Sequence, residues 1–181
     1  MTNNDHKISA TDKDFFERIR VNVAKLIEDS AKVEDGVGIR VLDIAPQDYE
    51  GAKRYYTAAT VETLDIDPAA NATFTVDLCE NNRVSIPDET FDVIICTEVL
   101  EHVNNPFDAA KEMFRILKKG GRIYVSTPYN FRIHGPLPDN WRFTEHGLRI
   151  LFSDFSVVDV VSLEDNHRFL MPVHYTTRVI K

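Results

Sequence analysis

The chain has 181 residues, a length that predicts a single globular domain with a sizeable core. Its formal net charge of −8 and its sequence pI of about 5.2 argue against a broad binding surface for nucleic acids or anionic membranes. It contains no membrane-length apolar run, no signal-peptide core and no CxxC pair for its two cysteines, so we expect a cytoplasmic protein without membrane insertion.

The first element expected along the chain is a long amphipathic helix. Residues 1–10 are expected to form a disordered leader, followed by one domain over 11–181. Thr11 is a candidate helix cap, with Asp14 three residues later in the position of a capping box. The helix is predicted over roughly 12–31 because apolar residues then recur at helical spacing. These residues are Phe15, Ile19, Val23 and Leu26.

A buried strand, an acid and a small-residue turn come next. Residues 39–44 are mostly apolar and β-branched, and Asp43 is the acid inside this run. The turn Ala45-Pro46-Gln47 follows directly. A strand, an acid and a turn in this order are typical of a nucleotide-type cofactor site at the carboxyl end of a first parallel strand. The turn lacks the GxGxxG pattern of dinucleotide folds, so a strand-end acid with no ligand is an equal alternative here.

Three further strands are predicted at 61–64, 73–76 and 91–96, with a short helix expected at 50–57. The segment between the second and third strands is too short for a normal crossover helix. The strand at 91–96 is almost wholly apolar, as expected for a strand that is buried on both faces.

The best-marked helix begins at Pro106, with Asn105 as its cap. Lys118 and Lys119 are placed in its last turn and Gly120 just past its end. Its predicted core stripe consists of Phe107, Ala110, Phe114 and Leu117.

The rest of the chain completes an α/β pattern. A strand at 123–126 precedes an irregular stretch at 128–143, and Thr144 can cap a short helix that ends near Phe152. Strands at 155–163 and 171–180 have no helix between them, so they are expected to pair antiparallel at one edge of the sheet. Strands that alternate with helices predict a mostly parallel sheet.

Several blocks of this sequence resemble the class I methyltransferases that use S-adenosylmethionine, and within them the type 11-like small-molecule group. The blocks are VLDIAPQDYEG (41–51), VETLDID (61–67), DL (77–78), FDVIICTEVLEHV (91–103) and LKKGGRIYVSTPY (117–129). The later stretch PYNFRIHGPLPDNWRFTEHGLRILF is similar to methyltransferases of bacterial surface-polysaccharide gene clusters. The resemblance implies a Rossmann-like, doubly wound sheet of seven mostly parallel strands with a C-terminal antiparallel β-hairpin.

The resemblance also implies which residues hold the cofactor. Asp43 would bind the ammonium group, Asp65 the ribose hydroxyls and Asp77 the adenine amino group. The other residues expected around the cofactor are Ala45, Gln47, Ile66, Asp67, Leu78, Thr97, Glu98 and Val99. One departure from the family pattern is that Ala45-Pro46-Gln47 replaces a glycine-rich turn. Pro46 supplies no N–H and is expected to hold Ala45 in an extended conformation.

Two histidines are candidates for the catalytic base. A hydroxyl acceptor must lose a proton during methyl transfer, and a histidine of near-neutral pKa can take it. His102 and His134 are the candidates, although His102 is equally interpretable as a hydrogen-bonding residue at a helix start. No metal site is expected, because His134, Asp139 and His146 share a region but no recognised ligand spacing.

The stretch 129–149 is the candidate acceptor site, because it concentrates arginine and aromatic side chains. We expect Tyr129, Arg132, Trp141 and Arg142 to bind a small anionic or carbohydrate-like acceptor, such as a phosphorylated or nucleotide-linked precursor of a surface glycan. The alternative is that these arginines pair with carboxylates of the protein itself.

The function predicted is therefore methyl transfer, most simply to an oxygen atom, with S-adenosylhomocysteine as the product. One alternative is a non-catalytic partner protein with a methyltransferase fold, which the altered turn after Asp43 keeps open. The other is a nicotinamide-dependent oxidoreductase, against which the missing GxGxxG counts. The sequence leaves the acceptor, the methylated atom and the oligomeric state open.

Overall fold

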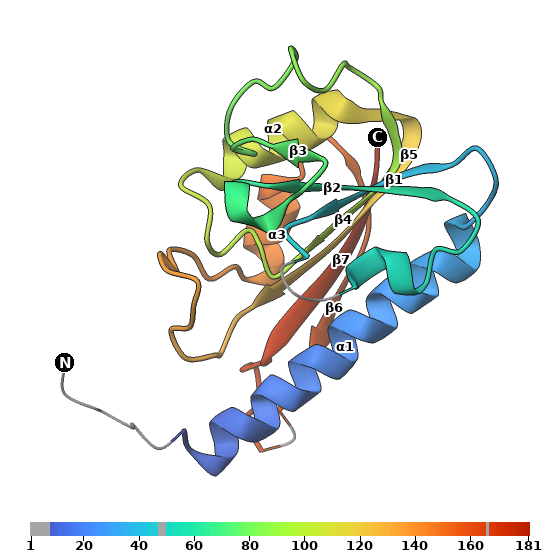
Figure 1. The fold of residues 1–181 in the computed structure, drawn as a ribbon. Coiled ribbons are helices and arrows are strands. Elements are labelled where there is room, and N and C mark those ends of the chain that lie inside the picture. Colours follow the sequence, from blue (N-terminus) through green and yellow to red (C-terminus); the bar gives the residue numbers. More distant parts are fainter. Residues whose placement is uncertain (1–7, 47–49, 166) are drawn as a thin grey trace.

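The structure is a computed structural model that describes residues 8–46, 50–165 and 167–181. Its centre is a seven-stranded sheet in the order β3-β2-β1-β4-β5-β7-β6. Helix α1 (Ala10–Glu34) runs across one face, and α2 (Pro106–Ile116) and α3 (Glu145–Leu151) cover the other (Figure 1). The strands are β1 (Arg40–Ile44), β2 (Thr60–Asp65), β3 (Phe74–Thr75), β4 (Phe91–Thr97), β5 (Leu117–Pro128), β6 (Ser156–Leu163) and β7 (His174–Ile180). This layered arrangement confirms the predicted α/β fold.

The directions of the strands also match the prediction. Strands β1 to β5 are parallel to their neighbours, whereas β7 lies antiparallel between β5 and β6. Two short 3-10 helices, η1 (Gly51–Arg54) and η2 (Pro68–Ala70), replace full helices after β1 and β2. Within the described residues, no helix is both long enough and apolar enough to cross a membrane.

Strand β4 explains why the sheet is covered on both faces. Its side chains alternate, so Ile94 and Cys96 join the core under α2 and α3, while Val93 and Ile95 join the core under α1. All four side chains are buried. Burial of a large apolar side chain such as Ile94 stabilises the fold by roughly 1.5–3 kcal/mol. The apolar run in the sequence is thus a central strand that neither face leaves exposed.

The start of α1 differs from the prediction. The cap is Ser9, whose Oγ accepts a hydrogen bond from the backbone N–H of Asp12 at 3.0 Å, and the helix begins at Ala10. Thr11 therefore lies inside the helix, and the capping role assigned to it is wrong. Two polar residues with hydroxyl groups precede the apolar stripe, and the sequence pattern alone does not decide which of them caps.

The end of α2 also differs from the prediction. The helix stops at Ile116, and Leu117 adopts an extended conformation and pairs with Phe91 of β4. Lys118 is therefore not in a last helical turn, and its Nζ instead donates to Asp92 Oδ2 at 2.7 Å. Phe107 does not belong to the core, because half of its surface is exposed, while Met113 is fully buried. Tertiary packing of Leu117 overrides the local signal of two lysines and a glycine.

The order of the strands fixes where a ligand can bind. Strand β1 is followed in the chain by β2 on one side, while β4 lies on its other side, with Ile44 next to Cys96. The chain therefore reverses its winding direction between β1 and β4. Open α/β sheets bind ligands in the crevice at the carboxyl ends of the strands at such a switch point.

Candidate functional site

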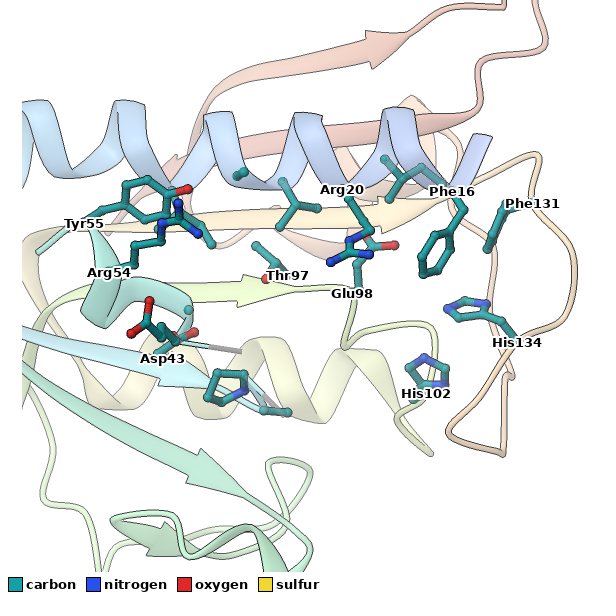
Figure 2. Close-up of a pocket in the computed structure, with 18 of the residues that line it drawn as sticks. Phe16, Arg20, Asp43, Arg54, Tyr55, Thr97, Glu98, His102, Phe131 and His134 are labelled. Atoms are coloured by element: carbon teal, nitrogen blue, oxygen red, sulfur yellow. The ribbon is translucent and has the colours of Figure 1, made fainter. Parts of the chain in front are cut away.

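A cavity of about 550 Å³ lies at this switch point, between α1 and the carboxyl ends of β1 and β4 (Figure 2). Its size falls within the range of small-molecule sites. Six of the residues predicted from sequence line it: Asp43, Ala45, Thr97, Glu98, His102 and His134. The structure therefore brings the strand-end residues and both candidate bases to one hollow.

The turn after β1 folds back onto Asp43. The Asp43 side chain is buried, and its Oδ2 accepts a hydrogen bond from the backbone N–H of Ala52 at 2.7 Å. Gly51 has a φ of +54°, and a Cβ at this position would lie 2.2 Å from Asp43 Oδ2. Burial raises the pKa of the Asp43 carboxyl to about 6, and the Ala52 hydrogen bond only partly offsets this.

The extended conformation predicted for Ala45 from its position before Pro46 is wrong. Its φ is +49°, in the left-handed region, and its N–H donates to Leu64 O at 2.7 Å beyond the end of the β1–β2 pairing. This hydrogen bond and the return of the chain to Asp43 outweigh the preference set by Pro46. Gln47, the third residue predicted for this turn, lies outside the described residues.

Glu98 follows β4 and is held by buried polar groups. Its Oε1 lies 2.7 Å from His174 Nε2 and accepts from Ser126 Oγ at 2.8 Å. Burial alone would raise the pKa of the Glu98 carboxyl, but His174 and Ser126 outweigh it and hold the pKa below its usual value. Glu98 also has a φ of +54°, so two non-glycine residues on the cavity wall have a strained backbone.

Next to Glu98 lies a cluster of Glu101, His102 and His134. Glu101 is fully buried, and neither of its carboxylate oxygens has a hydrogen-bond partner among the described residues. Its Oε1 lies 3.7 Å from His102 Nε2 and 3.6 Å from His134 Nε2. Burial and the neighbouring Glu98 charge raise the pKa of Glu101 to about 7. The Glu101 carboxylate in turn raises the pKa of His134, against the opposing effect of burial.

His134 reaches this cluster because its loop docks on the turn after β4. The backbone N–H groups of Asn140 and Trp141 donate to Glu101 O at 2.7 and 3.1 Å. Trp141 Nε1 donates to Val103 O at 2.9 Å. These hydrogen bonds hold the loop so that His102 and His134, 32 positions apart in sequence, have their ring centroids 5.0 Å apart. Figure 2 shows both side chains on the cavity wall.

The predicted acceptor residues take other roles in this loop. Arg142 donates to both carboxylate oxygens of Asp139, and Asp139 accepts from the backbone N–H of His134 at 3.0 Å. The Arg142 guanidinium therefore holds the loop together and lowers the pKa of Asp139 to about 2. Arg132 lies 3.8 Å from Asp12. For these arginines the structure favours the alternative, pairing with carboxylates of the protein itself.

None of the four predicted acceptor residues lines the larger cavity. Tyr129, Trp141 and Arg142 line a separate hollow of about 250 Å³ on the same loop, whereas Arg132 lines neither hollow. The loop still contributes to the larger cavity, but through Phe131, His134 and Gly135.

The residues predicted for the ribose and adenine lie beside the larger cavity rather than on its wall. Asp65 ends β2, and its Oδ1 accepts from the N–H of Asp67 at 2.9 Å. Asp77 accepts from the N–H of Cys79 at 2.8 Å. Ile66 is 65% exposed, which leaves an apolar face for a flat ring at the end of β2. Leu78 and Val99 are buried in the core below. Asp67 caps η2.

This arrangement fits S-adenosylmethionine. Carboxylates lie at the ends of the neighbouring strands β1 and β2, with an exposed apolar side chain next to the second. A cofactor with an ammonium group, a ribose and an adenine needs groups of these kinds in this order along the sheet edge. A zwitterion also needs a cation for its carboxylate, which Arg20 or Arg54 can provide from the cavity wall.

Sequence reasoning missed the contribution of α1 and η1 to the cavity. Phe16, Arg20, Arg54 and Tyr55 line it and appear in Figure 2 around the strand-end residues. The signal was present in α1, because Phe16 and Arg20 are four residues apart on a helix face next to the core stripe of Phe15 and Ile19. An arginine on that boundary indicated a face that covers a polar site.

Residues 33–125 match the family model described as a methyltransferase domain. The ubiquinone biosynthesis O-methyltransferase of Proteus mirabilis is 28% identical over 102 residues, which is 56% of this chain and 37% of that protein. The protein of the same name from Pseudomonas fluorescens strain SBW25 is 46% identical over 39 residues, which is 22% of this chain and 17% of that protein. The chain thus spans between about a sixth and about a third of these curated relatives.

Solved structures share the fold at low sequence identity. The cyclase SpnF has a TM-score of 0.69 and 14% identity, with 90% of this chain and 81% of that chain covered. The N-methyltransferase NodS of Bradyrhizobium japonicum WM9 has a TM-score of 0.64 and 15% identity, with 94% of this chain and 98% of that chain covered. A cyclase and a methyltransferase on one fold show that the site, and not the fold, must decide the chemistry.

Proposed function

The chain belongs to the methyltransferase domain family, and on this premise we propose that it transfers a methyl group from S-adenosylmethionine to an oxygen atom of a small acceptor. Members of this family use S-adenosylmethionine as the methyl donor. The family membership favours this activity over the nicotinamide-dependent alternative. The observation that carries the proposal is one cavity that joins the strand-end residues Asp43 and Glu98 to the histidines His102 and His134.

When it is bound, the cofactor supplies a methyl group on a positively charged sulfur, which leaves as a neutral thioether. Little stabilisation of a developing negative charge is then required, so positioning accounts for most of the catalysis. We assign Asp43 and Glu98 to the ammonium end and Asp65 to the ribose. In this proposal the acceptor binds in the remainder of the cavity, which α1 lines along one side.

The acceptor hydroxyl must lose its proton as the new bond forms. His102 Nδ1 lies 2.9 Å from Pro138 O, and a carbonyl oxygen only accepts, so Nδ1 carries the ring proton and Nε2 is free to accept another. His134 Nε2 is its neighbour in the cavity, with the ring centroids 5.0 Å apart. We propose that one of these two imidazoles receives the acceptor's proton.

For the acceptor we propose a hydroxyl-bearing molecule with an anionic group, of which a phosphorylated or nucleotide-linked sugar is an example. The support lies on the wall of the larger cavity, where one of Arg20 and Arg54 suits the cofactor carboxylate and the other suits an anion of the acceptor, and the rings of Phe16 and Phe131 suit a flat apolar face. The relatives with partial matches are O-methyltransferases, which agrees with an oxygen acceptor.

Two measurements test the proposal. Calorimetry is expected to show saturable binding of S-adenosylhomocysteine, and labelled S-adenosylmethionine is expected to pass its methyl group to hydroxyl-bearing acceptors. Binding without transfer to any neutral or anionic acceptor would favour the non-catalytic partner protein. Absence of binding would exclude both. Turnover of an anionic acceptor and of its dephosphorylated form separates the acceptor classes.

A further inference from the structure

The cluster of Glu101, His102 and His134 has the composition and spacing of a metal site. One ligand atom from each residue lies within 4.8 Å of those from the other two. The buried Glu101 carboxylate has no hydrogen-bond partner among the described residues, although it lies next to His102 and His134 of the cavity wall. A buried carboxylate without partners is costly, and an unsatisfied group of this kind in a folded protein calls for a ligand or an unrecorded ion.

One of the two imidazoles is oriented as metal ligands usually are. Histidines that bind metals generally donate their other ring N–H to a carbonyl or carboxylate. His102 Nδ1 does so, at 2.9 Å from Pro138 O, whereas His134 Nδ1 lies 3.2 Å from Asp139 Oδ2 without a hydrogen bond to it. Asp139 is itself held by Arg142. Each Nε2 atom is thereby left facing Glu101 Oε1.

We propose that Glu101, His102 and His134 bind a divalent first-row transition-metal ion at the edge of the larger cavity, which the two histidines line. Metal–ligand bonds of about 2.0–2.2 Å place ligand atoms on one ion roughly 3–3.5 Å apart. The Nε2-to-Oε1 separations of 3.7 and 3.6 Å are therefore close to the bound geometry. Two imidazoles and one carboxylate favour ions from manganese to zinc over magnesium or calcium, which prefer oxygen.

The use of this ion rests on the proposed function, whereas its binding does not. Three protein ligands leave a coordination position open toward the cavity that also contains Glu98. The acceptor hydroxyl would occupy that position, where the positive charge favours loss of its proton to solvent before the methyl group is transferred. His102 and His134 would then be ligands rather than bases, and the site would be one that sequence spacing alone did not predict.

Binding of Co²⁺ and Zn²⁺ to the untagged full chain, without S-adenosylmethionine, tests the site. Co²⁺ is expected to produce a saturable visible absorption band, and calorimetry is expected to show Zn²⁺ binding with one ion per chain, much tighter than Mg²⁺. The substitutions Glu101→Gln and His134→Gln are each expected to weaken Co²⁺ and Zn²⁺ binding by at least tenfold. His146→Gln is the matched control, because His146 is exposed on α3 of the same region. It is expected to bind like the wild type.

Thermal unfolding guards against a trivial loss of fold. Glu101→Gln removes a buried charge that no hydrogen bond satisfies among the described residues, so it is expected to melt no lower than the metal-free wild type while losing the stabilisation by Zn²⁺. No saturable Co²⁺ or Zn²⁺ binding by the wild type, or equal binding by all three variants, would overturn the metal site. A chain that binds S-adenosylhomocysteine but no metal overturns only this inference, whereas one that binds metal but no cofactor overturns only the proposed function.

Discussion

The ring of His174 connects Asn22 of α1 to Glu98 on the cavity wall. His174 is fully buried, with Nε2 2.7 Å from Glu98 Oε1 and Nδ1 3.0 Å from Asn22 Nδ2. An amide nitrogen only donates, so Nδ1 accepts and Nε2 carries the proton that is donated to Glu98. Strand β7 thus supplies the side chain that orients the carboxylate just after β4, and His174 is a positioning residue for Glu98.

The first prediction tests that role. His174→Leu leaves the Glu98 carboxylate and the Asn22 amide without their buried partner, so the free energy of unfolding is expected to fall by about 1–3 kcal/mol. His174→Gln retains an N–H donor and is expected to recover part of the loss. Calorimetry is expected to show weaker binding of S-adenosylhomocysteine by the Leu variant than by the Gln variant at equal folded fraction. Equal affinities in the two variants would contradict the positioning role.

The second prediction concerns Asp43 and pH. Its pKa is raised from 3.8 to about 6 in the folded chain, so the folded state binds this proton more tightly than the unfolded state does. The stabilisation from that proton is complete below the unfolded pKa and is lost as the pH rises through the folded pKa. A rise of about two pKa units means that the ionised Asp43 carboxylate destabilises the folded state by about 3 kcal/mol at neutral pH.

Asp43→Asn removes that cost and keeps an oxygen for the Ala52 N–H. Denaturant unfolding is expected to show the variant stabilised by up to about 3 kcal/mol near pH 8 and by roughly 1 kcal/mol near pH 4.5. The same variant is expected to lose affinity for S-adenosylhomocysteine, a trade of stability against function. A stability gain that does not change with pH would contradict the raised pKa.

The third prediction separates steric from backbone strain at Gly51. Gly51→Ala places a Cβ against Asp43 Oδ2 in addition to the cost of a φ of +54°, so a loss well above 1 kcal/mol of unfolding free energy is expected. Gly38→Ala is the matched control, because Gly38 has a φ of +86° but no atom within 4 Å of the added Cβ. Similar losses in both variants, measured by chemical denaturation, would show that contact with Asp43 is unimportant.

The fourth prediction concerns the ribose carboxylate. Asp65→Ala is expected to weaken S-adenosylhomocysteine binding by roughly 1.5–3 kcal/mol, the range for a hydrogen bond to a charged group. Because Asp65 Oδ1 also accepts from the Asp67 N–H, Asp65→Asn serves as the control, since it keeps an oxygen for that bond and loses the charge. Calorimetry that finds Asp65→Asn as tight as the wild type would assign the effect of Asp65→Ala to the turn rather than to the ribose.

The sequence sufficed for the fold because the determining signals are local. The apolar strand at 91–96, the proline at the start of α2 and the two final strands without a helix between them each predict an element from a few neighbouring residues. The positions that failed were decided by tertiary contacts. Leu117 leaves its helix to pair with Phe91, and Ala45 takes a positive φ to donate to Leu64.

The site could be predicted only where it lies at strand ends. Asp43 lies one residue before the end of one buried strand, and Glu98 directly follows another, so their common location could be predicted from parallel topology. The meeting of His134 with Glu101 depends on backbone hydrogen bonds from Asn140 and Trp141, which have no sequence periodicity. The sequence predicted no metal site, because His134, Asp139 and His146 have no recognised ligand spacing, whereas the structure places His134 beside Glu101.

The last prediction decides between two roles for Arg142. If the Arg142–Asp139 pair holds the loop that carries His134, Arg142→Lys exchanges a bidentate guanidinium for a point charge, and the loop loosens. Hydrogen exchange of the amides of residues 129–143 is expected to quicken, and turnover is expected to fall at saturating acceptor because His134 is less well placed. Arg132→Lys is the control, because among the described residues Arg132 forms a single ion pair, with Asp12 at 3.8 Å. It is expected to match the wild type in both measurements.

If Arg142 instead contacts an anionic acceptor, Arg142→Lys will raise the acceptor's KM and leave both the exchange rates and the maximal turnover unchanged. That outcome would return Arg142 to the acceptor site, and a rise in exchange with an unaltered KM assigns it to the loop.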